Sequence, residues 1–308
     1  MTAATEPALD TGLPEEPFRR GLVLAAVLVT VVAWASAFVA IRGIQETFDP
    51  GALALGRLAV GSAALSLAVL ARRSWVRPTR AEWGRILVCG VAWFAVYNVA
   101  LNAAEQRVDA GTAAMLVNVG PILIALLAGT VLGEGLPRWL LIGAGVAFSG
   151  ALLIGAATAS AEGSDAVGVL LCLLAALAWA VGVMAQKPVL RRLPALQVTM
   201  LACLAGTVVC LPFTAGLVAD ARDASTGSLV ALAYLGLVPT ALAFGTWAYA
   251  LSRMPAGRLG VTTYLVPPLT VLMAWPLLGE APPPLALAGG ALALVGVSLT
   301  RRKDRPRT

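Results

Sequence analysis

The sequence predicts an all-α membrane protein of ten transmembrane helices, arranged as two inverted five-helix repeats. Composition points to a membrane first: 59% of the 308 residues are hydrophobic and only 12% are charged, with a mean hydropathy of +0.86. A soluble domain of this size carries roughly twice that share of charge. The apolar residues form blocks close to the roughly 20 residues that a helix needs to cross the hydrocarbon layer. Because a backbone in lipid must satisfy its own hydrogen bonds, these blocks are expected to be helices. The two halves of the sequence also resemble each other.

Turns that contain Pro, Gly and charged residues separate ten apolar blocks. Asp49-Pro50-Gly51 and Pro282-Pro283-Pro284 are two such turns. The predicted spans are residues 21–41, 52–71, 84–104, 111–132, 138–157, 167–186, 196–216, 229–251, 257–278 and 284–300.

Polar stretches set the expected domain boundaries. The N-terminal stretch is rich in Glu, Pro and Thr, which is typical of a disordered tail. Residues 34–37, near the end of the first apolar block, leave a secretory signal peptide as an alternative, although the block is longer than a typical signal core. The expected organisation is a cytoplasmic tail (1–20), a first repeat (21–157), a linker (158–166), a second repeat (167–300) and a basic cytoplasmic tail (301–308).

Lysine and arginine residues are distributed very unequally between the two sides of this layout. With the N-terminus in the cytoplasm, eighteen of the 22 lie in cytoplasmic loops and tails, and Arg57 lies within the second span. Arg42, Arg107 and Arg222 alone fall outside. This asymmetry predicts a multi-pass protein of the inner (plasma) membrane with both termini in the cytoplasm. It also explains the pI of about 9.6 without a nucleic-acid partner, for which no basic stripe exists.

The second half of the sequence repeats the first when residue numbers are displaced by 146. Matched Gly, Pro and Gly-Glu positions carry the alignment: Gly111, Pro121, Gly133, Glu134, Gly143 and Gly150 fall on Gly257, Pro267, Gly279, Glu280, Gly289 and Gly296. At a displacement of 145, Trp34 falls on Trp179 and Arg42 on Lys187. Each repeat has five spans, an odd number, so the second should enter the membrane from the opposite side. Inverted repeats favour alternating access around a site near the middle of the membrane.

Several short motifs follow one another along the first half: Trp34-Ala35-Ser36-Ala37-Phe38, Gly56-Arg57-Leu58-Ala59-Val60-Gly61, Ala100-Leu101, Ala110-Gly111, Pro121 and Gly133-Glu134. The second half repeats the last four of these in the same order, as Ala250-Leu251, Ala256-Gly257, Pro267 and Gly279-Glu280. Over residues 21–300 the chain resembles the EamA group of the drug/metabolite transporter superfamily. The resemblance implies a ten-helix carrier of small organic metabolites, often an exporter. Arg57 departs from the repeat, because its counterpart lies near Leu201, which is not basic.

Polar and aromatic residues within spans are the candidates for substrate binding. They should form a cavity with aromatic walls, which cover an apolar ligand, and a few amide and hydroxyl groups, which orient it. A mid-span Asn can instead join two helices, and aromatic residues at span ends can form an interfacial belt. The candidates are Trp34, Phe94, Tyr97, Asn98, Asn118, Trp179, Thr240, Phe244, Trp247 and Tyr264.

Charged residues near the membrane give a second set of expectations. We expect Arg57 to extend towards the headgroups, with attraction of an anionic substrate as the alternative. Glu105, at the outer end of the third span, is the carboxylate nearest the bundle interior, and it leaves both proton exchange and facilitated export open. Glu134 and Glu280 lie at helix C-termini, where negative charge is unfavourable, so each should pair with a base or cap a loop.

These features favour a secondary transporter over an enzyme. The sequence has no histidine, its four cysteines lie in apolar blocks, and no paired buried carboxylates appear, so an intramembrane transferase or protease is the weaker alternative. A channel or scaffold fits the repeat less well. We expect no metal or other cofactor. The sequence has no phosphate-binding Gly-rich loop, so we do not expect transport to be driven by ATP hydrolysis within this chain. The expected partners are a small-molecule substrate and membrane lipid, with the chain as a monomer or homodimer.

Overall fold

The computed structural model describes residues 17–44, 46–107, 116–158, 165–278, 284–300 and 302, and every regular element in these ranges is helical. The first half contains α1 (Pro17–Arg42), α2 (Pro50–Arg72), α3 (Arg80–Cys89), the π-helix η1 (Gly90–Val96), α4 (Tyr97–Glu105), α6 (Gly120–Thr130) and α7 (Arg138–Thr158). The second half contains α8 (Ala166–Val189), α9 (Ala195–Cys210), η2 (Leu211–Phe213), α10 (Thr214–Asp223), α11 (Thr226–Leu235), the π-helix η3 (Gly236–Leu242), α12 (Ala243–Leu251), α13 (Ala256–Thr262), η4 (Thr263–Leu265), α14 (Val266–Leu278) and α15 (Pro284–Leu299).

Within the described residues, seven helical stretches are long and apolar enough to cross a membrane. The fourth, fifth and tenth predicted spans contain shorter apolar helices: Gly120–Thr130, Arg138–Ile154 and Leu287–Leu299. The all-α membrane class is therefore confirmed, while the count of ten spans stays a prediction. Both predicted tails, except for parts of their inner edges, and most of the predicted linker lie outside the described residues, as does Glu280.

The outward surface of the bundle is apolar. Large aliphatic side chains are exposed along helices from both halves, among them Leu28, Leu67, Leu70, Leu170, Val208 and Val230. Contiguous exposed apolar surface is rare on a soluble monomer, and in a bilayer it is the surface that contacts lipid. The same side chains that predict membrane spans in the sequence thus lie where lipid would cover them.

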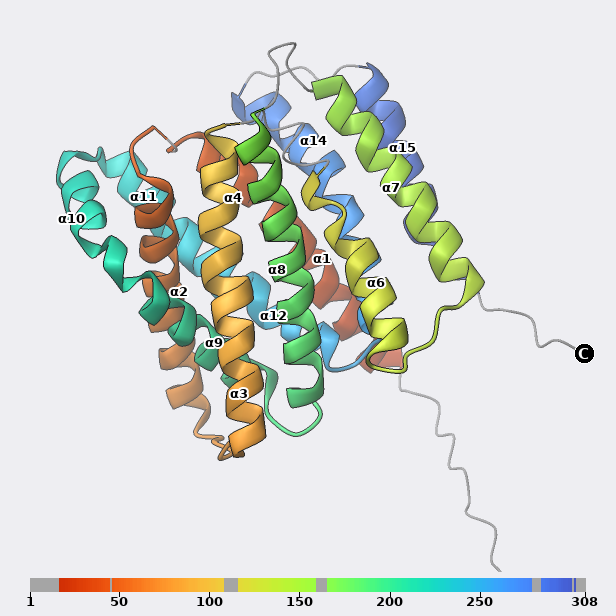
Figure 1. Cartoon of the computed structure of the whole chain (residues 1–308), viewed down its shortest axis with the longest axis horizontal. Coiled ribbons are helices and arrows are strands. Elements are labelled where there is room, and N and C mark those ends of the chain that lie inside the picture. The colour runs from red at the N-terminus through yellow and green to blue at the C-terminus, as the bar shows by residue number, and fades with distance from the viewer. Residues whose placement is uncertain are drawn as a thin grey trace, which may run out of the picture.

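Helices at equivalent positions of the two halves pack against each other in antiparallel pairs. In Figure 1, α7 and α15 lie side by side at one edge of the bundle. A Cβ atom added at Gly143 would lie 2.6 Å from the carbonyl oxygen of Gly296, and one added at Gly289 would lie 2.6 Å from that of Gly150. The two helices therefore run antiparallel. The absence of a side chain on these glycines permits the close approach.

Two further pairs of equivalent helices also run antiparallel. Along α2 and α9–α10, Gly51 approaches Phe213, whereas Ser62 donates to Cys203 Sγ over 3.2 Å. Where α13 and η4 pack against α6 and the residues before it, a Cβ atom at Gly257 would lie 3.3 Å from Ala125 Cα, whereas the hydroxyl of Tyr264 donates to the carbonyl oxygen of Asn118 over 2.9 Å. Asn118 and Tyr264 are themselves equivalent at the displacement of 146, so this bond lies where the two halves meet.

The two ends of the bundle are closed by different loops. One end, called here the α1–α2 end, carries the segment between α1 and α2, where the backbone N–H of Asp49 donates to Asp220 Oδ2 over 2.9 Å. The other, the α2–α3 end, carries the segment between α2 and α3, where Arg192 donates to the Arg77 carbonyl oxygen over 2.8 Å and forms an ion pair with Glu82.

Candidate functional site

An aromatic cluster occupies the interior between the two halves of the chain. Trp34 lies at its centre, with its ring centroid 5.1 Å from that of Trp247 and 5.5 Å from that of Phe244. The Phe94 and Phe244 rings are 4.5 Å apart. The members come from α1, η1, α4, α8 and α12: Trp34, Trp93, Phe94, Tyr97, Trp179, Phe244 and Trp247. The structure thus brings together six of the ten residues predicted from the sequence.

The rings of the aromatic cluster contact one another rather than line an open space. Trp93, Phe94, Trp179, Phe244 and Trp247 are all buried, and their centroid distances are those of offset or edge-to-face pairs. In this conformation of the described residues, the space predicted to be a cavity is therefore filled by the rings themselves.

Glycine residues on neighbouring helices make room for two of the indoles. A Cβ atom at Gly182 would lie 2.4 Å from the Cβ of Trp93, and one at Gly120 would lie 2.6 Å from the Trp179 ring. Both positions require glycine for the cluster to pack as it does, because no real side chain tolerates such contacts.

Two π-helices at equivalent positions flank the aromatic cluster. η1 and η3 begin at Gly90 and Gly236, which are related by the displacement of 146. Pro239 in η3 has no N–H to donate, and its carbonyl oxygen accepts a bond from Trp34 Nε1 over 3.3 Å. Single-turn π-helices within longer helices are often found at functional sites. They carry Trp93 and Phe94 in one half and Thr240 in the other.

The predicted polar residues of the site stabilise these π-helices. The Asn98 amide donates to the carbonyl oxygen of Phe94 over 2.8 Å, and the Thr240 hydroxyl donates to that of Leu235 over 2.8 Å. Both side chains are buried. In this conformation both side chains therefore bond to backbone carbonyl groups four or five residues earlier along the chain.

Arg57 lies inside the protein rather than at the headgroups. Its residue is 6% exposed, and its Nε donates to Thr240 Oγ1 over 3.2 Å. The prediction that Arg57 extends towards the headgroups is therefore wrong. The reason is packing: η3 covers this face of α2 so closely that a Cβ at Gly236 would lie 2.9 Å from the Arg57 carbonyl oxygen.

Two indole N–H groups of the aromatic cluster have no partner among the described residues. Trp179 Nε1 and Trp247 Nε1 are buried and form no hydrogen bond with the described residues. Gln186, on the same helix as Trp179, is equally buried, and neither its amide nitrogen nor its amide oxygen has a partner among those residues. Buried donors are normally satisfied, so each unpaired one needs an explanation. A ligand with acceptor atoms would provide it.

Tyr264 belongs to a hydrophobic cluster separate from the aromatic cluster, and its hydroxyl donates to the backbone of Asn118. Tyr264 packs with Phe148 at a centroid distance of 6.3 Å and belongs to a separate hydrophobic cluster with residues of α7 and α15. The bond between these two predicted site residues therefore joins equivalent segments of the two halves. The sequence analysis grouped them with the aromatic cluster because both lie mid-span.

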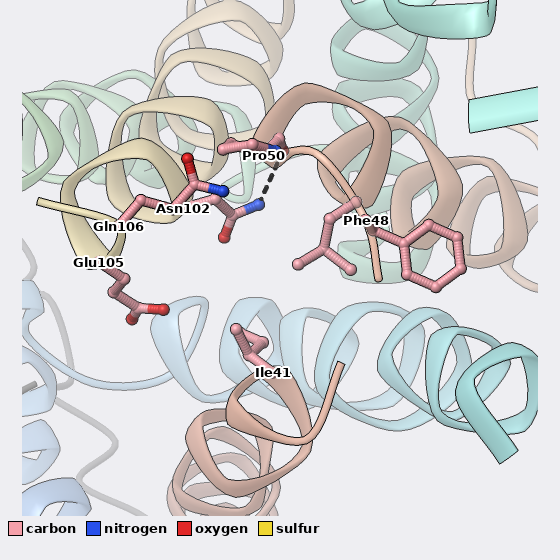
Figure 2. Close-up of a pocket in the computed structure, with 7 residues that line it drawn as sticks. Ile41, Phe48, Pro50, Asn102, Glu105 and Gln106 are labelled. Atoms are coloured by element: carbon pink, nitrogen blue, oxygen red, sulfur yellow. Dashed lines mark hydrogen bonds between the residues drawn. The ribbon is translucent and has the colours of Figure 1, made fainter. Parts of the chain in front are cut away.

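A small pocket opens at the α1–α2 end of the bundle, with a free volume of about 10 Å³. Glu105, Asn102 and Gln106 at the end of α4 form its polar side, and Ile41, Phe48 and Leu53 line its apolar side. Figure 2 shows the Glu105 carboxylate and the Asn102 side chain turned towards the same space. The carboxylate that the sequence singled out is thus a lining residue of this pocket.

At the opposite end, Glu134 pairs with a base, as predicted. Its Oε1 lies 3.7 Å from Lys187 Nζ, and its Oε2 accepts from the Gly257 N–H over 3.4 Å. Lys187 Nζ also donates to the carbonyl oxygens of Leu251 and Met254, at 2.6 Å each. One lysine therefore ties the ends of α8 and α12 to the loop after α6.

Three residues that belong to these sites are absent from the predicted set. Trp93 precedes Phe94 in η1, and its ring centroid lies within 6.5 Å of the centroids of five other aromatic rings. Asn102 follows Asn98 by one helical turn and precedes Glu105 by less than one, so a polar stripe along one helical face would have revealed it. Gln186 is a buried amide near the end of α8, and the polar-residue criterion should have included it.

These features define a class: a multi-pass helical membrane protein built from two similar halves. The sequence profile of the EamA-like transporter family matches residues 20–156 and 166–302, one segment in each half. The chain belongs to the EamA-like transporter family.

Several known proteins are similar along nearly the whole chain. A probable terminal-alkyne amino-acid exporter of Streptantibioticus cattleyicolor is 39% identical over 92% of this chain and 94% of its own length. An uncharacterized transporter, YdfC, of Bacillus subtilis is 33% identical over 88% of both chains. A probable amino-acid metabolite efflux pump of Escherichia coli is 27% identical over 91% of this chain and 94% of its own length. A crystal structure with 22% identity shares the fold, with a TM-score of 0.75 over 92% of this chain and 97% of the other.

Proposed function

We propose that this protein is a secondary transporter that exports small organic metabolites, with amino acids as the leading class, by alternating access. The observation that carries the proposal is the position of the aromatic cluster. It lies between two halves whose equivalent helices pack in antiparallel pairs, and it contains buried indole donors without partners among the described residues.

Inverted repeats account for the antiparallel pairs. If each half crosses the membrane five times, the second half has the opposite orientation, and its helices run antiparallel to their counterparts. Two such halves can exchange conformations, so that a site between them opens first to one side and then to the other. The three antiparallel pairs and the paired π-helices support this arrangement, with ten spans in total.

The aromatic cluster is the proposed substrate site. Its rings would cover an apolar side chain, and the unpaired N–H groups of Trp179 and Trp247 would donate to acceptor atoms such as those of a carboxylate. The rings must separate to admit a substrate, so the described conformation is a closed one. Asn98, Thr240 and Arg57 lie next to the rings, and we assign them to the wall of the opened site.

The proposed topology places both termini in the cytoplasm of a cell with an inner (plasma) membrane. The α1–α2 end then faces outside and the α2–α3 end faces the cytoplasm. The Lys187–Glu134 contacts close the cytoplasmic end, while the pocket beside Glu105 lies at the outer end. The names of the relatives favour export, and amino acids are the substrate class that two of those names print.

Export can be tested directly. Cells that overexpress the protein should resist toxic amino-acid analogues and release amino acids into the medium, and proteoliposomes should show saturable transport. Trp34→Ala should abolish both effects while the amount of protein in the membrane stays unchanged. Transport that does not saturate, or wild-type transport in the Trp34→Ala variant, would contradict the proposal.

A further inference from the structure

The pocket at the α1–α2 end offers hydrogen-bond acceptors whose partners are missing among the described residues. Asn102 is 5% exposed, and its Nδ2 donates to the carbonyl oxygen of Pro50 over 3.0 Å. Because that carbonyl can only accept, the amide nitrogen must face it, and the amide oxygen faces away. Asn102 Oδ1 is buried and has no partner there. Figure 2 shows it directed into the pocket.

Glu105 adds a second acceptor on the same side. Within the part of the chain that the structure describes, its carboxylate forms no hydrogen bond or ion pair, although the charges of Arg57 and Arg42 act on it from a distance. A carboxylate and an amide oxygen that lie one helical turn apart, neither with a hydrogen-bond donor among the described residues, suit a ligand that donates several hydrogen bonds. An ammonium group has three donors and the complementary charge.

The rest of the lining determines which ammonium fits. Ile41, Phe48 and Leu53 present aliphatic and aromatic surface opposite the acceptors. A hydrated inorganic cation would gain nothing from that surface, whereas an alkyl or aryl group next to the ammonium would bury apolar area there. The free space beside the acceptors, about 10 Å³, admits about one group of the size of a water molecule, which suits the ammonium head group of a small primary amine.

We infer that this pocket binds the ammonium group of an apolar amine or amino acid at the outer end of the transport route, with Asn102 Oδ1 and the Glu105 carboxylate as acceptors. The position of the pocket on a transport route rests on the proposed function, but binding of the ammonium group can be measured without transport.

The test uses the purified full-length protein in detergent and follows its thermal unfolding. n-Pentylamine is the probe, and 1-pentanol is its uncharged counterpart. n-Pentylamine should raise Tm, because a ligand that binds only the folded state stabilises it, and 1-pentanol should not. Glu105→Gln should raise the amine concentration needed for half of the effect by about tenfold, because a charge-assisted bond is lost. Asn102→Leu should do the same.

Glu46→Gln is the matched control, because Glu46 is an exposed carboxylate at the same end of the bundle outside the pocket. It should bind the amine as the wild type does. Equal stabilisation by 1-pentanol or by NaCl at the same concentration, or an unchanged response in Glu105→Gln, would overturn the assignment of the pocket. If the wild type exports amino acids but shows no response to the amine, the pocket assignment alone fails. If it binds the amine but transports nothing, the proposed function alone fails.

Discussion

Gly90 and Gly236 occupy the same place in the two halves, and each presses the start of a π-helix against the backbone of a helix from the other half. A Cβ at Gly90 would lie 2.6 Å from the carbonyl oxygen of Ala202, and one at Gly236 would lie 2.9 Å from that of Arg57. Arg57 and Ala202 are also equivalent, at the displacement that relates Trp34 to Trp179. The contact is therefore made twice by the same pair of elements, once in each direction across the interface.

Alanine at either glycine should destabilise the protein. The added methyl group cannot be accommodated without moving a backbone carbonyl, and overpacking of this kind costs about 1–3 kcal/mol. Gly90→Ala and Gly236→Ala should both lower Tm in detergent and reduce export. Gly84→Ala and Gly245→Ala are the controls, since nothing lies within 4 Å of a Cβ at either position. They should be neutral or stabilising by up to about 1 kcal/mol. Equal Tm values in all four variants would contradict the packing described.

Removing the amine of Lys187 should cost more than removing the charge of Glu134. Lys187→Gln loses two 2.6 Å bonds to carbonyl groups as well as the ion pair, and unsatisfied buried groups cost about 1–3 kcal/mol each. Glu134→Gln keeps an oxygen that can accept from the Gly257 N–H. Thermal unfolding of both variants measures the difference. A larger loss of Tm in Glu134→Gln would show that the ion pair, and not the carbonyl contacts, closes this end.

Changes in the aromatic cluster should separate packing from binding. Trp34→Ala removes a ring that contacts four others and should cost about 3–5 kcal/mol. Asn98→Ala and Trp179→Ala should also impair export without preventing membrane insertion. Trp179→Phe and Trp247→Phe keep a ring but remove the unpaired N–H, so they should raise KM with little change in Tm. Trp75→Phe, at a residue that is 55% exposed, is the control. Wild-type KM in both cluster variants would exclude these donors from substrate binding.

The ion pair between Arg107 and Asp165 should make stability depend on pH in acid. Arg107 Nη1 lies 2.8 Å from Asp165 Oδ2, and the Val167 N–H donates to Oδ1 over 3.0 Å. The Arg107 bond, with a smaller contribution from Val167, lowers the pKa of Asp165 below its usual value. A carboxyl group whose pKa is lowered by folding stabilises the protein at pH values above its pKa in the unfolded state, which is about 4 for Asp. It loses that contribution as the pH falls through its pKa in the folded state.

Asp165→Asn should therefore lose this part of the acid dependence. The difference in Tm between the wild type and Asp165→Asn should be largest near neutral pH and should shrink as the pH falls below about 4. Because both side chains are solvent-exposed, added salt should weaken the effect as well. A difference in Tm that stays constant from neutral to acid pH would contradict the ion pair.

Much of this fold follows from patterns that the sequence carries openly. Block length and composition predict membrane helices, because the thickness of the bilayer fixes the length and lipid excludes charge. The displacement between the two halves predicts which helices are equivalent, and it also relates Thr79 to Ser225, which cap the starts of α3 and α11. Such features depend on local chemistry and on order along the chain, and both can be read from a sequence.

The environment of single residues could not be predicted in the same way. The position of Arg57 near the outer end of the second span predicts an anchor in the headgroups. In the structure, η3 from the other half of the chain covers it. The two π-helices have no periodic signal, because a π-turn adds one residue to an apolar run that is apolar on every side. Asn118 and Trp34 are both mid-span, and only helix packing decides that the backbone of Asn118 bonds to Tyr264 in η4 while Trp34 lies at the centre of the aromatic cluster.

The inverted arrangement of the halves is tested most directly by Ala81→Cys and Gly227→Cys. Both positions are exposed, and they lie at equivalent places at the starts of equivalent helices, while the native cysteines of the described residues are buried. A membrane-impermeant maleimide applied to intact cells should label Gly227→Cys and leave Ala81→Cys unlabelled until the membrane is permeabilised. Labelling of both variants from the same side would contradict the inverted repeat, and alternating access between two halves with it.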